Sequence, residues 1–125
     1  MHLAQFDSAS NLLKLSFAGQ VGADEAKKCA QEIEALLRQA RPGFRLLTDL
    51  SGLEAMDLAC VPYLEQTMDR CSEQGIDTVV RVIPDPQKDI GFNILSLFHY
   101  NRRVRIVTCE TMQEALNSLA PATTS

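Results

Sequence analysis

Hydrophobic and polar residues alternate in segment 12–19 of the chain. Leu13, Leu15 and Phe17 occupy one face of this pattern, and Lys14 and Ser16 lie between them. A period of two predicts a strand with one buried face. A short extended piece and a polar turn, residues 5–11, precede the strand, so the pattern predicts an N-terminal β-hairpin.

A different spacing begins after Gly22, where apolar residues recur every three or four positions. This period predicts an amphipathic helix with one stripe facing a core. Gly22 is the expected N-cap, Asp24 and Glu25 bring negative charge to the first turn, and the Pro-Gly pair at 42–43 ends the helix. The stripe consists of Ala26, Cys29, Ala30, Ile33, Leu36, Leu37 and Ala40.

The rest of the chain alternates between strand and helix patterns. We expect strands at 44–49, 77–83 and 104–108, and helices at 57–74, 88–99 and 110–119. Pro62 either makes the first turn of the helix 57–74 irregular or moves the start of the regular helix toward Cys60. Strands joined by helices run parallel. The expected fold class is α/β, with a mixed, largely parallel sheet of about five strands and about four helices.

Composition changes this picture little but excludes several classes of protein. The chain has 125 residues, 46% of them hydrophobic and 22% charged, so we expect one globular domain over residues 1–119 and a flexible tail at 120–125. A net charge of -4 argues against nucleic-acid binding, which needs clustered Lys and Arg. No leader or membrane-spanning run is recognisable, so we expect a cytoplasmic protein.

Polar residues mark the passage from the central strand to the second helix. The strand is expected to end at Asp49, a turn at Ser51 and Gly52 follows, and Asp57 stands where the helix begins. A carboxylate at a helix start accepts hydrogen bonds from free backbone amides and is favoured by the helix dipole. Asp57 is therefore predicted to be an N-cap.

This segment resembles the signature of STAS domains, the fold shared by anti-sigma factor antagonists and the cytoplasmic tails of sulfate transporters. Asp49, Ser51, Met56 and Asp57 match the signature at the right spacing. The resemblance implies a STAS-like βα superhelix. In the family, a kinase phosphorylates a Ser or Thr after the second Asp, and the added charge releases or recruits a partner. Leu58 stands at that position here, so the resemblance implies a non-enzymatic signalling or partner-switching module without the phosphoacceptor.

Two further positions depart from the signature, since Ala59 replaces a second small hydroxyl residue and Cys60 replaces Gly. We interpret the segment as a constitutive docking surface for a protein partner, such as an anti-sigma factor or a kinase-like signalling protein. In the alternative, Asp49 and Asp57 only cap and brace the turn, and Leu58 packs inward. The residues assigned to partner binding are Asp49, Ser51, Glu54, Asp57, Leu58 and Cys60.

Each of four expected strands carries one basic residue. Charged side chains are rarely buried without a partner, so we expect these to point to the sheet face that the helices leave open. There they form a solvated face or, if their registers align, a basic stripe for an acidic partner or an anionic headgroup. The residues are Lys14, Arg45, Arg81 and Arg105.

The expected helix 88–99 is apolar on more than one side. Such a helix most simply packs on the sheet. The alternatives are a site for a small apolar or lipid ligand, which would make the protein a carrier, and a surface for self-association into a homodimer. The residues assigned to this ligand or dimer surface are Phe92, Leu95, Phe98, Arg102 and Arg103.

Catalysis has little support in the sequence. The four cysteines lie far apart without a C-x-x-C pair, so they indicate neither a zinc site nor a redox site, and we interpret them as buried hydrophobic residues. Cys60 is the exception, because it lies in the signature. The two histidines are His99 and His2, the latter in a terminus expected to be mobile. We predict no catalytic residue, no metal and no cofactor. The cysteines are Cys29, Cys60, Cys71 and Cys109.

Overall fold

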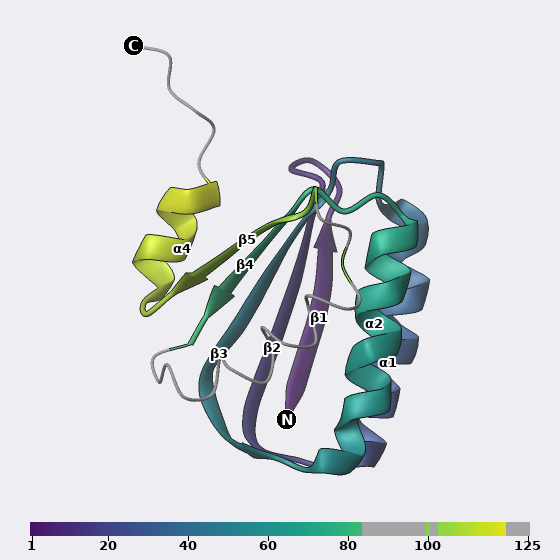
Figure 1. Cartoon of the computed structure of the whole chain (residues 1–125), viewed down its shortest axis with the longest axis vertical. Helices are drawn as coiled ribbons and strands as arrows, with labels where there is room; N and C mark the ends of the chain where they lie inside the picture. The colour runs from purple at the N-terminus through teal and green to yellow at the C-terminus, as the bar shows by residue number, and fades with distance from the viewer. Residues whose placement is uncertain (84–99, 101–102, 120–125) are drawn as a thin grey trace.

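The computed structural model describes residues 1–83, 100 and 103–119. Strands and helices alternate along this part of the chain after an N-terminal hairpin, as the sequence pattern predicts (Figure 1). The elements are β1 (His2–Asp7), β2 (Leu12–Val21), α1 (Ala23–Leu36), a 3₁₀ turn (Leu37–Gln39), β3 (Arg45–Met56), a second 3₁₀ turn η2 (Leu58–Cys60), α2 (Val61–Glu73), β4 (Thr78–Val82), β5 (Arg105–Cys109) and α4 (Met112–Leu119).

The five strands form one mixed sheet in the order β1-β2-β3-β4-β5. β1 and β2 are antiparallel, and the other neighbouring pairs are parallel. A tight hairpin can only join antiparallel strands, whereas a helical crossover returns the chain in the same direction. The predicted α/β class with a mixed, five-stranded sheet is confirmed, with three α-helices among the described residues.

Helices cover both faces of the sheet. α1 and α2 lie side by side over one face, where Leu13, Ile33, Phe44, Cys71 and other residues form the larger buried core (Figure 1). α4 covers part of the other face. The smaller core under α4 consists of Leu12, Leu47, Val80, Val82, Cys109, Ala115 and Leu119.

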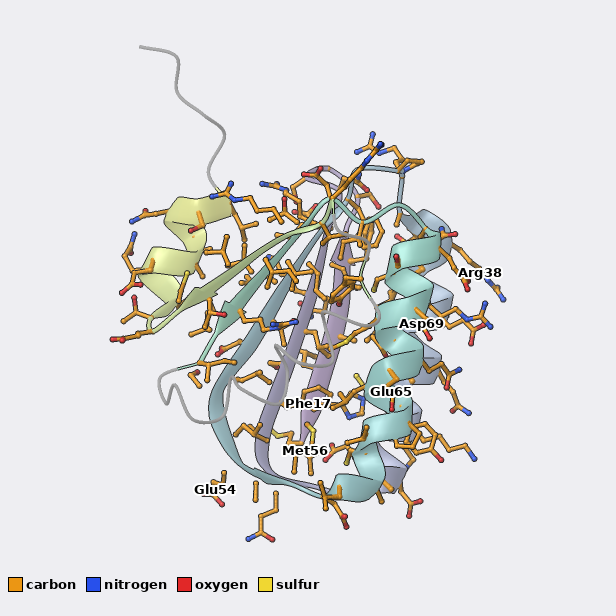
Figure 2. All side chains as sticks on the ribbon, in the orientation of Figure 1. Phe17, Arg38, Glu54, Met56, Glu65 and Asp69 are labelled. Atoms are coloured by element: carbon orange, nitrogen blue, oxygen red, sulfur yellow. The ribbon has the colours of Figure 1, made fainter. Side chains whose placement is uncertain are left out.

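β3 continues well beyond Asp49, so the predicted turn at Ser51 and Gly52 is wrong. β2 runs alongside it as far as Val21, and pairing with β2 gives the backbone of β3 its hydrogen-bond partners. β3 carries one extra residue at each of two register shifts in this pairing, opposite Ser16–Ala18 and opposite Gly19–Gln20 of β2. Beyond the end of β4, β2 and β3 continue as a two-stranded ribbon, and Glu54 lies at its outer curve (Figure 2).

The helix ends follow the predicted local chemistry. Gly22 is the N-cap of α1 in an extended conformation. α2 begins at Val61 after a 3₁₀ turn, which places Pro62 in its first turn, where the missing N–H costs no helical bond. Gly75 follows α2 with φ of 88°, the left-handed conformation typical of C′. No helix among the described residues has the length and apolar character needed to cross a membrane.

The prediction that all four strand bases point to one open face of the sheet is wrong at Arg81. Register alternation places Lys14, Arg45 and Arg105 on the α4 side of the sheet and Arg81 on the side of α1 and α2, where it is only 2% exposed. β4 is buried along its whole length, so its two faces cannot be told apart from hydrophobicity. Arg45 donates from Nη1 to the carbonyl of Leu119 at 2.5 Å, which ties α4 to the sheet.

His2 is also not in a mobile terminus. It lies in β1, and its ring nitrogens contact the carboxylates of Glu25 at 3.1 Å and Glu32 at 2.9 Å, both on α1. α4 begins two residues later than predicted, because the hydroxyl of Thr111 accepts a hydrogen bond from the amide of Glu114. The predicted helix 88–99 lies outside the described residues.

Candidate functional site

The outer end of the β2–β3 ribbon leads directly into the first turn of α2. Glu54, Ala55, Asp57, Leu58 and Ala59 are all exposed there. They follow one another on a segment held by β2 on one side and by the helix on the other. The structure thus presents these residues together on one corner of the molecule, which we call the ribbon corner.

Asp57 anchors the ribbon corner to the rest of the protein. Its Oδ1 atom accepts a hydrogen bond from the amide of Ala59 at 3.0 Å, and its carbonyl accepts one from the amide of Cys60 at 2.9 Å. Its own amide donates to the carbonyl of Val21 at 3.0 Å. The predicted N-cap is confirmed, although the turn that it caps is the 3₁₀ turn η2. These bonds fix the backbone on both sides of Leu58.

Leu58 projects away from the core. Its side chain is 86% exposed, the largest value among the large hydrophobic residues of the described chain. The alternative in which Leu58 packs inward is therefore not what the structure shows. A single exposed leucine is common on protein surfaces. What distinguishes this one is its position on a capped turn, directly after the exposed Asp57 and four residues after the exposed Glu54.

Cys60 does not belong to the surface that the sequence predicts. It is completely buried, and its sulfur lies 3.5 Å from the carbonyl oxygen of Val21. Burial is the main cause that raises the pKa of its thiol, and the nearby Asp57 carboxylate acts in the same direction. The STAS signature has glycine at this position, whereas here the chain carries a buried thiol beneath the 3₁₀ turn.

Asp49 and Ser51 lie apart from the ribbon corner. Asp49 is paired with Val82 at the end of β4, at the base of the ribbon, whereas the ribbon corner is at its outer end. Its Oδ1 atom accepts hydrogen bonds from the amide of Ser51 at 3.0 Å and from the Ser51 hydroxyl at 2.6 Å. The six residues predicted to bind a partner thus separate into an Asp49–Ser51 pair, a ribbon corner with Glu54, Asp57 and Leu58, and the buried Cys60.

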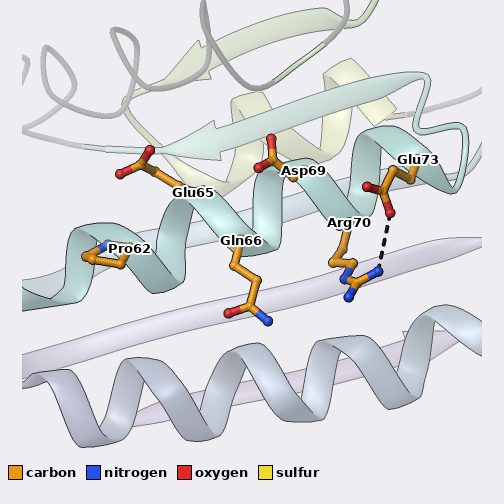
Figure 3. A pocket seen from close by; sticks show the side chains of 6 residues that line it. All are labelled: Pro62, Glu65, Gln66, Asp69, Arg70 and Glu73. Atoms are coloured by element: carbon orange, nitrogen blue, oxygen red, sulfur yellow. Dashed lines mark hydrogen bonds and ion pairs between the residues drawn. The ribbon is translucent and has the colours of Figure 1, made fainter.

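The outward side of α2 is a surface that the sequence did not single out. A hollow of about 460 Å³ lies along this helix (Figure 3). Gln66 and Arg70 point toward α1, whereas Glu65 and Asp69 point to the other side of α2. Glu65, Asp69 and Glu73 recur every four residues, and this spacing could have been read from the sequence as an acidic surface of the helix. The hollow is lined by Pro62, Glu65, Gln66, Asp69, Arg70 and Glu73.

Arg70 limits how negative this helix surface is. Its guanidinium lies 3.5 Å from a carboxylate oxygen of Glu34 on α1 and 3.4 Å from one of Glu73. Both pairs are about half exposed, so their contribution to stability is small. The Glu34–Arg70 pair joins α1 to α2, whereas Glu73 is on α2 itself.

Most residues of the predicted ligand or dimer surface, namely Phe92, Leu95, Phe98 and Arg102, lie outside the described residues. Arg103 is exposed. Within the described part of the chain, the apolar cavity next to Tyr100 and Arg81 measures about 30 Å³, which is room for about one water molecule. The ligand-carrier alternative stays a prediction.

The cysteine thiols offer no activated nucleophile of the usual kind. All four are free and buried. Burial raises the pKa of Cys29 and of Cys71 to about 12, whereas reactive cysteines have lowered pKa values and partial exposure. Across residues 1–83, 100 and 103–119, no group of three or more His, Cys, Asp or Glu residues is placed to hold a metal ion.

Comparison with known proteins places the fold. Neither a comparison with protein-family models nor one with curated proteins returns a match. Among solved structures, an uncharacterised protein with a SpoIIAA-like fold from Shewanella loihica aligns with a TM-score of 0.74 and 12% identity, over 95% of this chain and 94% of that chain.

Two anti-sigma factor antagonists align over similar lengths. The Bacillus cell fate determinant SpoIIAA in its phosphorylated form has a TM-score of 0.66 and 13% identity, covering 96% of this chain and 100% of that chain. An anti-sigma factor antagonist from Mycobacterium paratuberculosis has a TM-score of 0.60 and 20% identity, covering 95% and 94%. At these identities the likeness concerns the fold. The chain has the STAS-like fold of SpoIIAA, as the resemblance in its sequence predicted.

Proposed function

We propose that this protein is a non-enzymatic interaction module that docks a protein partner through the ribbon corner, with Leu58 as the apolar anchor. The observation that carries the proposal is the 86% exposure of Leu58 on a turn that Asp57 caps. SpoIIAA and a protein from Mycobacterium paratuberculosis, both of the same fold, are named anti-sigma factor antagonists, and SpoIIAA was solved in an unphosphorylated and in a phosphorylated form. These names support a signalling role for this chain.

The chemistry of the ribbon corner indicates what the partner presents. A leucine on a fixed turn gains free energy by entering an apolar pocket, roughly 1.5–3 kcal/mol for full burial. Glu54 and Asp57 precede the leucine on the same exposed corner and favour Lys or Arg beside that pocket. The net charge of -4 also favours approach of a basic partner. The partner is therefore a protein with an apolar pocket bordered by cations.

Docking in this proposal is constitutive. Leucine has no hydroxyl group to accept a phosphate. The position at which the STAS signature has its phosphorylated Ser or Thr therefore stays apolar in this chain. Ser51 is the nearest exposed hydroxyl in the ribbon, and it donates to Asp49 rather than standing beside Leu58. A kinase acting on the STAS position would find a substrate only in a Leu58→Ser variant.

Leu58→Asp tests the proposal. Immobilised wild-type protein and the variant are compared for retention of proteins from lysate of the source cells. Leu58 is exposed in η2, so a charged side chain there removes no buried contact and the variant should stay folded. Leu116→Asp is the matched control, because Leu116 on α4 is 50% exposed and lies away from the ribbon corner.

The expected result is a partner that the wild type and Leu116→Asp retain and that Leu58→Asp loses, with at least a tenfold drop in affinity once that partner is purified. Equal retention by all three proteins would contradict docking through Leu58. Phosphate found on Ser51 of the native protein by mass spectrometry would contradict the constitutive character. A cytoplasmic location is part of the proposal, and the four free thiols support it, because a reducing compartment keeps thiols unpaired.

A further inference from the structure

β1 forms one edge of the sheet, and one row of its backbone groups points away from β2. The amide of Ala18 donates to the carbonyl of Met1 at 2.8 Å, and the amino group of Met1 donates back to the carbonyl of Ala18 at 3.0 Å. In an antiparallel pair, residues that exchange both bonds alternate with residues that exchange none. The register therefore turns the backbone groups of His2, Ala4 and Phe6 outward.

The other side of β2 gives the same assignment independently. The carbonyls of Asn11 and Val21 accept bonds from the amides of Arg45 and Asp57, at the two ends of β3. The backbone groups of odd-numbered residues of β2 thus point toward β3, and those of even-numbered residues, such as Ala18, point toward β1. No other strand among the described residues pairs with the outer side of β1.

β1 lacks the features with which proteins protect an edge strand. Such edges usually carry a lysine, a proline or a bulge, or they are very short. Residues 3–6 of β1 carry no charge and no proline, and the pairing of β1 with β2 has no register shift over six residues. The opposite edge, β5, carries the exposed cation of Arg105. The exposed side chain of Leu3, at 55%, lies on the sheet face next to this edge.

We propose that β1 pairs with β1 of a second copy of this chain, antiparallel about a twofold axis at Ala4, so that two five-stranded sheets join into one. This register places Ala4 opposite Ala4 of the second copy and His2 opposite Phe6. All three outward-facing residues then find partners, with two hydrogen bonds in each pair. This inference is independent of the proposed function, because the ribbon corner is formed by β3 and η2.

The side chains fit a twofold arrangement. The only residue that meets its own copy is Ala4, which is small and uncharged. On the open sheet face, Leu3 lies opposite Gln5 of the second copy, so the exposed leucine gains a neighbour that covers it. The two Asp7 carboxylates are six strand positions apart, about 20 Å, which is well beyond the screening length of about 8 Å. The net charge of -4 therefore does not oppose the contact at close range.

A six-residue edge alone gives a small interface, so the dimer should depend on concentration. Sedimentation velocity over a concentration series from micromolar to near millimolar measures it. Ala4→Pro removes one outward N–H from each copy and no bond to β2, and Leu3→Lys places a charge on the edge while leaving every backbone group. Each should raise the dimer dissociation constant at least tenfold. Leu116→Lys, which removes another exposed leucine on α4, should leave the constant unchanged.

Spin labelling tests the register itself. The four native cysteines are buried, so a Gln5→Cys variant takes the nitroxide at the exposed position 5. The two Gln5 Cα atoms are expected roughly 8 Å apart in the dimer, close enough for strong dipolar broadening. A label at Arg105→Cys, on the opposite edge, should show none. A wild type that stays monomeric near millimolar, or a dimer that persists in both Ala4→Pro and Leu3→Lys, overturns the proposal. An extended strand of another protein would remain as the occupant in the monomeric case.

Discussion

The carboxylate of Asp57 accepts a hydrogen bond from the amide of Ala59 at 3.0 Å, and this contact closes the turn between β3 and α2. Asp57→Ala removes it and leaves an amide at the start of the helix without its acceptor. We expect a loss of about 1 kcal/mol in the free energy of unfolding, which lowers Tm by roughly 3–6 °C in a chain of this length. Thermal unfolding followed by circular dichroism measures the change.

Asp57→Asn is the control for that prediction. Asparagine keeps an acceptor oxygen of the same reach and caps helices about as well as aspartate. Its Tm should stay close to that of the wild type. If Asn lowers Tm as much as Ala does, the negative charge and not the hydrogen bond stabilises the turn.

The N-cap could be predicted because its chemistry is local, whereas the course of β3 could not. Whether the chain turns at Ser51 and Gly52 or continues as a strand depends on a partner distant in sequence, and β2 supplies that partner as far as Val21. The Gly52 position shows the same dependence. A Cβ atom there would lie 3.2 Å from the Cβ of Ala18, so the glycine permits close approach of the two strands and does not mark a turn.

The direction of a strand side chain could be predicted only for strands that have one solvent-exposed face. Lys14 alternates with buried neighbours in β2, and its exposed face follows from the pattern. β4 is buried on both faces, so nothing in its composition assigns Arg81 to one side. The proposed docking site could be predicted only in part, for a related reason. Leu58 could be singled out because it differs from a known signature. The burial of Cys60, two residues later, depends on the packing of the folded chain, which the signature does not specify.

Gly75 requires both its conformation and its missing side chain. Its φ is 88°, and a Cβ atom there would lie 3.3 Å from the Cα of Pro42. The carbonyl of Gly75 also accepts a hydrogen bond from the amide of Gly43, in the same loop as Pro42, at 2.7 Å. Gly75→Ala should therefore destabilise the protein by roughly 1–2 kcal/mol. Urea denaturation gives the free energy of unfolding directly.

Gly22→Ala is the matched comparison for Gly75→Ala. Gly22 has φ of -99°, and nothing lies within 4 Å of the Cβ that alanine would add. Glycine is a better N-cap than alanine, so this exchange should cost roughly 0.5–1 kcal/mol through the cap alone, with no backbone strain. A loss at Gly75 no larger than the loss at Gly22 would contradict the strain assigned to the α2–β4 connection.

The buried cysteines should not react with alkylating reagents in the native protein. Only the thiolate reacts, and burial raises the pKa of Cys29 and Cys71 to about 12. Native protein treated with iodoacetamide at pH 8 should gain no label at these two residues, and denatured protein should gain one at each of its four cysteines. Mass spectrometry counts the adducts. Rapid labelling of native Cys71 would show that the core under α2 opens readily.

Asp7 gives the hairpin an acid-sensitive contribution to stability. The hydroxyl of Ser10 donates to its Oδ2 atom at 2.8 Å, and this bond, followed by that from the amide of Ala9, lowers the pKa of Asp7 below its ordinary value of 3.8. Because the folded pKa is lower than the unfolded one, the contribution is complete above the unfolded pKa. It is lost as the pH falls through the folded value. Asp7→Asn should therefore unfold with a weaker pH dependence than the wild type in this acidic range, measured as Tm against pH. Ser10→Ala removes the largest cause and should reproduce most of the effect, and an unchanged acid limb in both variants would exclude Asp7 as its source.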